Sequence, residues 1–380
     1  MLPPEPVAPG HEIATIPRHD AKRNSYKIAL IRAINDIVTG FPDLSVGGRD
    51  VAVPLRVLAA RWVAYYWPFA DPAAPVWQGA RTARSRDVAF RPDLEALRAA
   101  WEATNGPASP ADGFFLVDAV RVPRRRERLS PELVRAHDAA VRRIADLIGR
   151  YPVRYAGPGE YSVFGPPVRL DALGDVAAVP GTQPADVCVV VRSDLWATFD
   201  ALSLWVEALC VHEWSLFAEG FNDGTADRGA VFSLLTARPD NRVSLSWERN
   251  EVDVLMLEGH AFTCPWTARR LTGPADYALD HLLPLAVYPV NDLWNLLPAD
   301  RAFNTWKRDR LPSEDALAAA TPRFANAYGL YLTSDALGGV LQQGAALRFP
   351  AVDVARPDEV AGAAARFIRH VAATRNVPTF

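Results

Sequence analysis

Asp280 and His281 are adjacent at the end of a short apolar run, and their side chains suit chemistry on a phosphate ester. A carboxylate is a hard oxygen ligand that suits Mg²⁺ or a similar divalent ion. A histidine beside it that is not itself a ligand can take a proton from water near neutral pH. The pair therefore offers a metal ligand and a general base.

Asn295, Asn304 and Lys307, which follow later in the chain, extend this set. Asn304 can supply a second oxygen ligand. Lys307 follows it by three residues, one turn along the same face if the segment is helical, and offers positive charge for a phosphate oxygen. With the amide of Asn295, these residues provide the parts of a single-metal phosphodiesterase: a metal clamp, a base and charge stabilisation at the leaving side.

The elements around these residues must position them. The apolar residues 277–279 predict a short strand that ends at Asp280. Pro284 and Pro289 keep the following segment out of regular helix or sheet. We therefore expect a strand, an irregular loop and then a helix that carries the last candidate residues.

This stretch resembles the HNH endonuclease motif, in the variant with asparagine as the third signature residue. The resemblance spans residues 264–312 and rests on Asp280, His281, Pro284, Asp292, Asn295, Asn304, Lys307, Leu311 and Pro312. It implies a ββα-metal fold, in which two antiparallel strands, a loop and a helix grip one divalent cation, Mg²⁺, Mn²⁺ or another.

The resemblance also implies a role for each position. Asp280 and Asn304 resemble the metal ligands, and His281 resembles the general base. Asn295 resembles the central asparagine, which braces the loop so that the histidine points correctly. Lys307 has a frequent counterpart near the phosphate. The residue types of Asn291 and Asp292 are typical of turns, so we expect both to be turn-forming residues.

One feature of many HNH proteins is missing here. They carry two CxxC pairs that hold a structural zinc, whereas Cys264 is followed by a threonine at position 267 and no second pair follows. Zinc needs four ligands, and one thiol cannot hold it. We expect no structural zinc, with apolar packing of Trp266, Trp294 and Trp306 in its place.

The whole chain predicts an α+β protein: a mainly helical N-terminal part, the ββα module near the C-terminus and a helical tail. The expected regions are 1–110 (helical), 111–250 (mixed, ending in a long helix over 195–217), 251–313 (the module) and 314–380 (the tail). Residues 1–20 are Pro-rich and expected to be loosely held. Further helices are predicted over 25–38, 53–66, 94–104, 130–149, 314–320, 322–330 and 359–373, a strand over 186–191 and a strand-like piece over 161–164.

The formal net charge is −3, so any DNA contact must come from local basic groups. Two such groups flank the candidate site, namely Arg269 with Arg270 and Lys307 with Arg308 and Arg310. We expect both to contact nucleic acid. The arginines of residues 121–128 are more typical of a solvated face.

Other features indicate the setting. No run of 18 apolar residues and no signal-peptide pattern is present, which predicts a cytoplasmic protein without a membrane contact. The cysteines, Cys188, Cys210 and Cys264, have no tight spacing and are expected to be free thiols. His212 and Glu213 lack a second histidine at position 216, so they are interpreted as a structural pair or surface residues.

The expected function is a divalent-metal-dependent DNA endonuclease, in bacterial restriction or anti-phage defence by analogy with the family. An activating or targeting protein is a further expected partner. Two alternatives remain: a catalytically silent nucleic-acid-binding or assembly subunit, and an RNase toxin.

Overall fold

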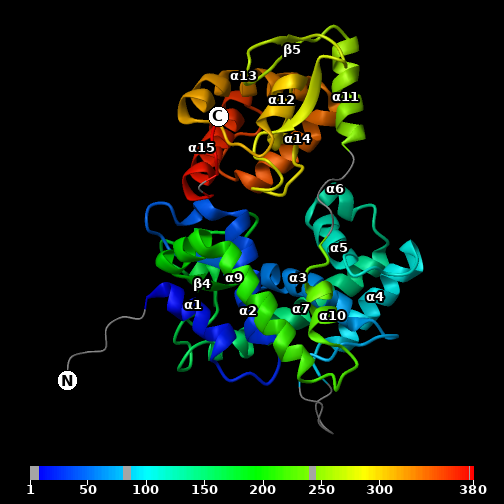
Figure 1. Ribbon diagram of the computed structural model, residues 1–380, viewed down its shortest axis with the longest axis vertical. Helices are drawn as coiled ribbons and strands as arrows, with labels where there is room; N and C mark the ends of the chain where they lie inside the picture. The colour runs from blue at the N-terminus through cyan, green and yellow to red at the C-terminus, as the bar shows by residue number, and fades with distance from the viewer. Residues whose placement is uncertain (1–7, 80–86, 239–244, 376) are drawn as a thin grey trace, which may run out of the picture. The chain divides into compact units, whose positions relative to one another are not determined.

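The computed structural model describes residues 8–79, 87–238, 245–375 and 377–380. The chain forms two compact units, Met1–Pro239 and Asp240–Phe380, each with its own hydrophobic core (Figure 1). The fold is mixed α+β, as the sequence predicts, and is about 59% helical. The first two expected regions lie largely in the first unit, and the module and the tail share the second.

The first unit is helical around one small sheet. The sheet has the order β2-β4-β1-β3, with β1 antiparallel to β4 and parallel to β3. Its strands are β1 Val51–Pro54, β2 Val168–Arg169, β3 Ala177–Ala178 and β4 Val187–Val191. The helices are α1 Pro9–Arg18, α2 Tyr26–Gly40, α3 Leu55–Tyr66, α4 Arg91–Asn105, α5 Asp112–Arg121, α6 Pro123–Arg126, α7 Pro131–Arg150, α8 Pro152–Tyr155, α9 Ser193–Glu219 and α10 Arg228–Leu235.

The predicted helices of this unit are confirmed as α2, α3, α4, α7 and α9, and the strand over 186–191 is confirmed as β4. Ser130 caps α7, since its hydroxyl accepts from the Leu133 amide at 3.2 Å. Ser25 does not cap α2, because its hydroxyl is buried against the Tyr66 hydroxyl at 2.7 Å. The piece over 161–164 is not a strand, and Tyr161 has a φ of +51° within a turn.

The expectation of a loosely held N-terminus is wrong for residues 9–18, which form α1; residues 1–7 lie outside the described part. Ile13 and Ile16 are three residues apart on one helical face, and both are buried in the core. Pro9 is at the first helical turn, where its missing N–H costs nothing. The Pro-rich composition therefore begins a helix instead of preventing one.

The aromatic positions of α9 divide between core and solvent. Trp196, Phe199 and Trp214 are fully buried, as a core stripe requires. Trp205 of the same helix is 75% exposed, and Leu202 beside it is also exposed. The difference follows from the sequence of α9, because its apolar positions are distributed around the helix instead of along one face.

The second unit contains two hairpin-like strand pairs and a group of helices. β5 pairs with β6, and β7 pairs antiparallel with β8, with Tyr277 opposite Asp300 and His281 opposite Leu296. The elements are α11 Ser246–Leu257, β5 Phe262–Thr263, β6 Arg270–Leu271, β7 Tyr277–His281, the 3₁₀ turn η4 Leu293–Asn295, β8 Leu296–Asp300, α12 Arg301–Lys307, α13 Glu314–Thr333, α14 Asp335–Arg348 and α15 Pro357–Arg375.

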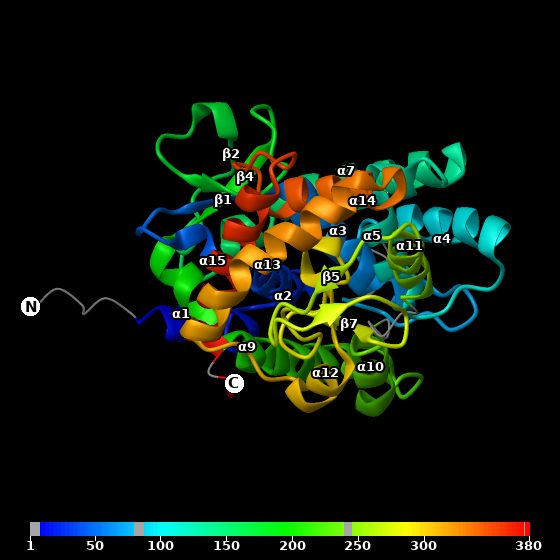
Figure 2. The ribbon, with the colours of Figure 1, turned by 90° about the horizontal axis from the view of Figure 1, so that it is seen from above.

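The predicted helical tail packs on these strands. The segments predicted over 314–320 and 322–330 are one helix, α13, which continues through Pro322. α13 lies between α15 and the strands (Figure 2). The buried hydroxyls of Tyr328 and Tyr331 donate to the carbonyl oxygens of Trp294 and Leu296, so the tail holds the start of β8 in place.

Among the described residues, no helix is long and apolar enough to cross a membrane. Cys188, Cys210 and Cys264 are free thiols, as predicted, and all three are buried.

Replacing Trp294 with alanine is expected to destabilise the second unit by about 3–5 kcal/mol, the usual cost of removing a fully buried aromatic side chain. Its ring is fully buried and packs edge-on against Phe349 and Phe367, with ring centres 5.2 and 5.9 Å away. Urea denaturation followed by circular dichroism measures the loss. The matched control is Trp306→Ala, since Trp306 is 53% exposed. Equal losses in both variants would contradict this account of the core.

Candidate active site

The candidate residues lie on β7, β8 and α12 and on the loop that joins the two strands. α12 begins directly after β8, where the Asp300 carboxylate accepts from the Phe303 amide at 3.0 Å and so caps the helix. α12 contacts both strands. Asp280 and His281 are consecutive on β7, so their side chains point to opposite faces of the strand pair.

Asp280 points toward α12 and is only 4% exposed. Its Oδ1 accepts from Lys307 Nζ at 2.8 Å. Its Oδ2 accepts from Lys307 Nζ at 2.9 Å and from the indole nitrogen of Trp266 at 2.7 Å. The carboxylate is therefore neutralised by Lys307 and oriented by both Lys307 and Trp266.

The Lys307 ammonium is enclosed at this site. The side chain is fully buried, its Nζ also donates to the His281 carbonyl oxygen, and it lies 5.5 Å from the centre of the Trp266 ring. This differs from the expected position beside a phosphate. The physical reason is that a buried carboxylate requires a compensating charge, and the last turn of α12 supplies it.

His281 points toward the loop and is half-buried. Its Nε2 lies 2.7 Å from Oδ1 of Asn291. An amide oxygen accepts hydrogen bonds, so this contact favours the tautomer that carries its proton on Nε2 and leaves Nδ1 with a lone pair. Burial lowers the pKa of His281 below its ordinary value of 6.5, although the Asn291 contact and nearby Asp280 oppose the shift. The ring is therefore neutral at pH 7.

Asn295 is completely buried and joins the two ends of the loop. Its Oδ1 accepts from the Leu283 amide at 2.8 Å, and its Nδ2 donates to the carbonyl oxygens of Leu283 at 3.0 Å and Val290 at 3.3 Å. These are the contacts that a loop-bracing amide makes. They fix the chain on both sides of the segment that follows His281.

Asn304 is partly buried in the middle of α12. Its side chain makes no hydrogen bond within the part of the chain that the structure describes. Residues three apart on a helix are neighbours, with Cβ atoms about 5–6 Å apart. Lys307 reaches Asp280, so Asn304 lies one helical turn before the residue that contacts the carboxylate.

The oxygens around the Lys307 ammonium suit a cation, since Oδ1 and Oδ2 of Asp280 and the His281 carbonyl oxygen all accept from it. Carboxylate and amide oxygens are the preferred ligands of Mg²⁺, and the Asp280 carboxylate already holds a cationic group, the Lys307 ammonium. Within the described residues, no group of three or more His, Cys, Asp or Glu side chains is arranged to hold a metal. An ion at Asp280 and Asn304 would therefore take its remaining ligands from water and substrate.

The segment that contains Cys264 and Trp266 also supports the Asp280 carboxylate. The buried Cys264 sulfur accepts from the backbone amides of Asp300 at 3.2 Å and Thr267 at 3.4 Å. Trp266 packs edge-on against Phe324 and Phe380. Apolar packing is thus found for Trp266 and Trp294, whereas Trp306 is more than half exposed and does not fill the expected place.

The basic residues beside the site have different surroundings. Arg269 pairs with Asp300 at 2.7 Å, and Arg310 donates to the Trp306 carbonyl oxygen at 2.6 Å. Arg270 on β6 and Arg308 after α12 are exposed. These two are therefore better placed to meet a phosphate than Lys307, which is buried.

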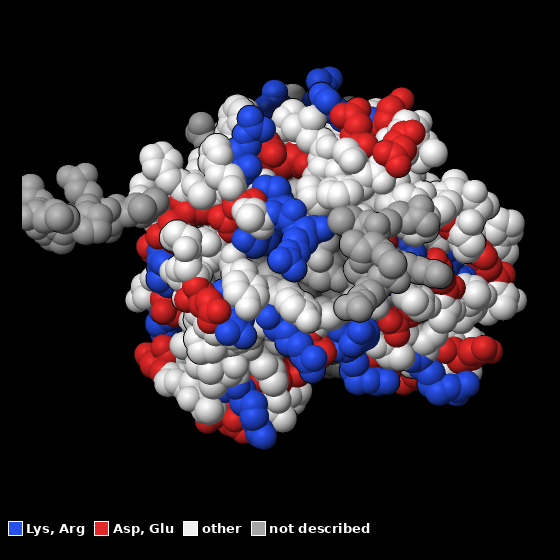
Figure 3. Space-filling view, turned by 90° about the horizontal axis from the view of Figure 1, so that it is seen from below, with Lys and Arg blue, Asp and Glu red and all other residues white. Residues whose placement is uncertain are grey.

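Surface charge elsewhere is mixed. Basic and acidic side chains are interspersed over the face drawn in Figure 3, where one denser group of Lys and Arg lies near the middle. In the 121–128 segment, Arg125 and Arg121 pair with Asp118, and Arg126 pairs with Asp138. Such pairs are typical of the solvated face that the sequence predicts.

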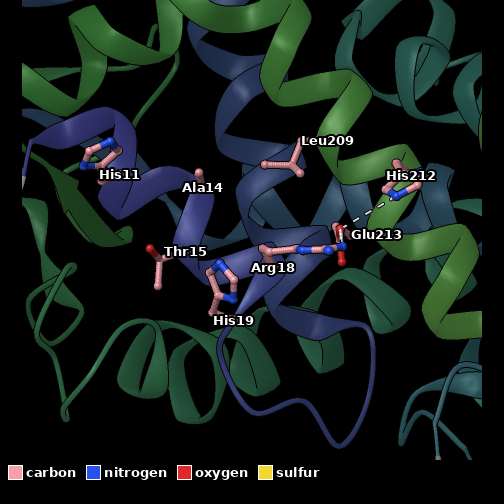
Figure 4. Close-up of a pocket in the computed structure, with 8 residues that line it drawn as sticks. All are labelled: His11, Ala14, Thr15, Arg18, His19, Leu209, His212 and Glu213. Atoms are coloured by element: carbon pink, nitrogen blue, oxygen red, sulfur yellow. Dashed lines mark hydrogen bonds and ion pairs between the residues drawn. The ribbon is translucent and has the colours of Figure 1, made fainter.

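The His212–Glu213 pair lines a pocket of about 510 Å³ between α1 and α9 in the first unit (Figure 4). Glu213 is buried and accepts from Arg18 at 2.6 Å, which ties the two helices together. His212 is more than half exposed. This arrangement agrees with the structural interpretation of the pair.

Two residues of the site were not predicted from the sequence in their observed roles. Asn291 orients His281, although its residue type indicates only a turn, and Trp266 donates to Asp280, although its type indicates only packing. Both contacts join residues on different segments, and no local pattern encodes such a contact.

A family model described as "Domain of unknown function (DUF8808)" matches residues 7–235, so the chain belongs to this family. The match lies within the first unit, and the candidate site lies outside it. No curated protein matches the chain. No solved structure matches it either.

Replacing Asn295 with alanine is expected to destabilise the second unit by about 1–3 kcal/mol or more, because it leaves buried backbone groups of Leu283 without partners. Thermal and urea denaturation measure the loss. Asn304→Ala is the matched control and should change stability by no more than about 0.5 kcal/mol, as at other sites without a specific contact. A larger effect at Asn304 than at Asn295 would contradict the assigned contacts.

Proposed function

We propose that the chain is a divalent-metal-dependent endonuclease of the HNH type that hydrolyses DNA phosphodiester bonds. The cation would be Mg²⁺, Mn²⁺ or a similar ion. By analogy with the family, the biological setting that we propose is bacterial restriction or anti-phage defence in the cytoplasm.

One observation carries this proposal. A carboxylate and a neutral histidine leave the same strand of an antiparallel pair, a buried asparagine braces the loop after them, and a helix follows the second strand. This order of elements agrees with the ββα-metal fold that the motif implies. The residue types and their spatial order thus support the same chemistry.

The residues of the site have distinct roles in this chemistry. Asn291 holds Nε2 of His281, so Nδ1 is the atom that takes a proton from the attacking water. Asp280 and Asn304 would hold a divalent cation, which when bound polarises the phosphoryl group and stabilises the leaving oxygen. Asn295 positions the loop and thereby the base. Arg270 and Arg308 are the cations exposed for the DNA backbone.

A second candidate is a catalytically silent nucleic-acid-binding or assembly subunit. The observation that favours it is the contact of both Asp280 oxygens with Lys307. Supercoiled plasmid incubated with purified protein and Mg²⁺ or Mn²⁺ distinguishes the two candidates. Binding without nicking supports the silent subunit, and cleavage of labelled RNA alone in the same assay supports the RNase alternative.

Replacing His281 with alanine is expected to lower the plasmid-cleavage rate by about 10²–10⁴, the usual contribution of a general base. Metal and DNA binding should persist, because Asp280 and Asn304 remain. The comparison variant is Asp280→Ala, which loses a ligand and should be partly rescued by excess Mn²⁺. Parental cleavage by the His281 variant would place the base elsewhere.

The pH dependence of cleavage is expected to reflect the lowered pKa of His281. The base acts when it is unprotonated, so the rate should be constant near neutral pH and fall as the pH drops through the pKa of the folded protein. Because that pKa is lowered, the midpoint should lie below 6.5. Single-turnover rates between acid and neutral pH measure it at saturating metal. A midpoint above 6.5 would contradict the assignment.

A further inference from the structure

Lys307 and Asp280 form a buried ion pair in the candidate site of the second unit. The lysine side chain is fully buried and the aspartate side chain is 5% exposed. The two oxygens of Asp280 are not equivalent. Oδ2 accepts from both Lys307 and Trp266, whereas Lys307 is the one hydrogen-bond donor that the described residues offer to Oδ1.

We infer that Lys307 is the resident cation of this site, and that a divalent metal binds at Asp280 by taking the place of its ammonium on Oδ1. Trp266 keeps its hydrogen bond to Oδ2 during the exchange and so positions the carboxylate. This inference rests on the proposed function only in assigning Asp280 as a metal ligand.

The distances require an exchange. A divalent cation binds a carboxylate oxygen at about 2.0–2.6 Å, while Lys307 Nζ lies 2.8 Å from the same Oδ1 and 2.9 Å from Oδ2. Two cations so close together, in a site with little water to screen them, repel each other strongly. Metal and ammonium therefore compete for one carboxylate.

The surroundings determine which group moves. Trp266 is packed edge-on against Phe324 and Phe380, with ring centres 5.6 and 5.3 Å away, so its indole stays fixed. Lys307 is the last residue of α12, and Arg308 after it is exposed with a φ of +51°. A lysine stem has four rotatable carbons and can swing out from a helix end. The ammonium is thus the mobile partner.

The exchange also explains how Lys307 can contact Asp280 here and still act near a phosphate, as the motif implies. With the metal absent, the ammonium neutralises Asp280. With the metal bound, the ammonium is released beside the site and carries a positive charge that a phosphate can meet. Metal binding and phosphate binding are thereby coupled through one side chain.

The test is a calorimetric titration of the full chain with Mn²⁺ alone. Lys307→Met keeps the length and apolar stem of the lysine and removes its charge. We expect this variant to bind Mn²⁺ about tenfold tighter or more, the size of effect that residues next to metal ligands commonly have. Equal or weaker binding by Lys307→Met overturns the inference.

Two control variants make the result specific. Trp266→Phe removes a hydrogen-bond donor to Asp280 but leaves the Lys307 ammonium, so its Mn²⁺ affinity should not increase. An increase equal to that of Lys307→Met overturns the cation exchange. Asp280→Asn combined with Lys307→Met should abolish the gain, since the carboxylate is the shared ligand. A gain that persists in the double variant places the metal elsewhere and overturns the inference.

If Lys307→Met lowers the stability of the chain, its melting temperature with and without Mn²⁺ still tests the inference. The variant leaves Asp280 unpaired when no metal is present, so Mn²⁺ should raise its melting temperature more than that of the parent chain. An equal or smaller rise overturns the inference. Plasmid cleavage is assayed separately. Tighter Mn²⁺ binding by Lys307→Met together with no nicking by the parent chain supports the exchange and rejects the nuclease. Nicking by the parent chain without tighter binding by the variant supports the nuclease and overturns the exchange.

Discussion

The arrangement of the second unit depends on one buried ion pair, in which Lys307 neutralises the Asp280 carboxylate. Asp280 lies on β7 with almost no exposed surface, and it is paired with a lysine from α12 and an indole from the segment after β5. Breaking a buried pair by removing one partner commonly costs about 3–5 kcal/mol. The pair therefore fixes how α12 and the Trp266 segment lie against the strands, and it does so with the residues that would perform chemistry.

Asn295 and the helical tail provide the rigid support for this arrangement. The asparagine satisfies backbone groups at both ends of the loop that follows His281, so the loop needs no regular structure of its own. Tyr328 and Tyr331 of α13 satisfy carbonyl groups at the start of β8. The positions of His281 and Asp280 are thus determined by packing and hydrogen bonds from distant parts of the chain.

The two units divide the molecule into a family domain and a candidate catalytic module. The family match covers the first unit, where charged pairs such as Arg18–Glu213 join helices and the core is strongly aromatic. The proposed chemistry belongs entirely to the second unit. The stability of each core and the chemistry of the site can therefore be studied with separate substitutions.

The sequence by itself determined the local elements and the candidate residues. Apolar periodicity located α2, α3, α4, α7 and α9, and the short apolar run before Asp280 located β7. Residue types and spacing selected Asp280, His281 and Asn295. Such signals are local, because helix and strand periods repeat within a few residues.

Only the tertiary structure decided what the side chains contact. Lys307 has the same sequence signal whether it meets a phosphate or Asp280, and the contact depends on how α12 packs against β7. The same holds for Asn291 with His281 and for Trp266 with Asp280. These partners lie 10 to 27 residues apart in the chain. Their distance in space is set by the burial of whole elements, which no short sequence pattern records.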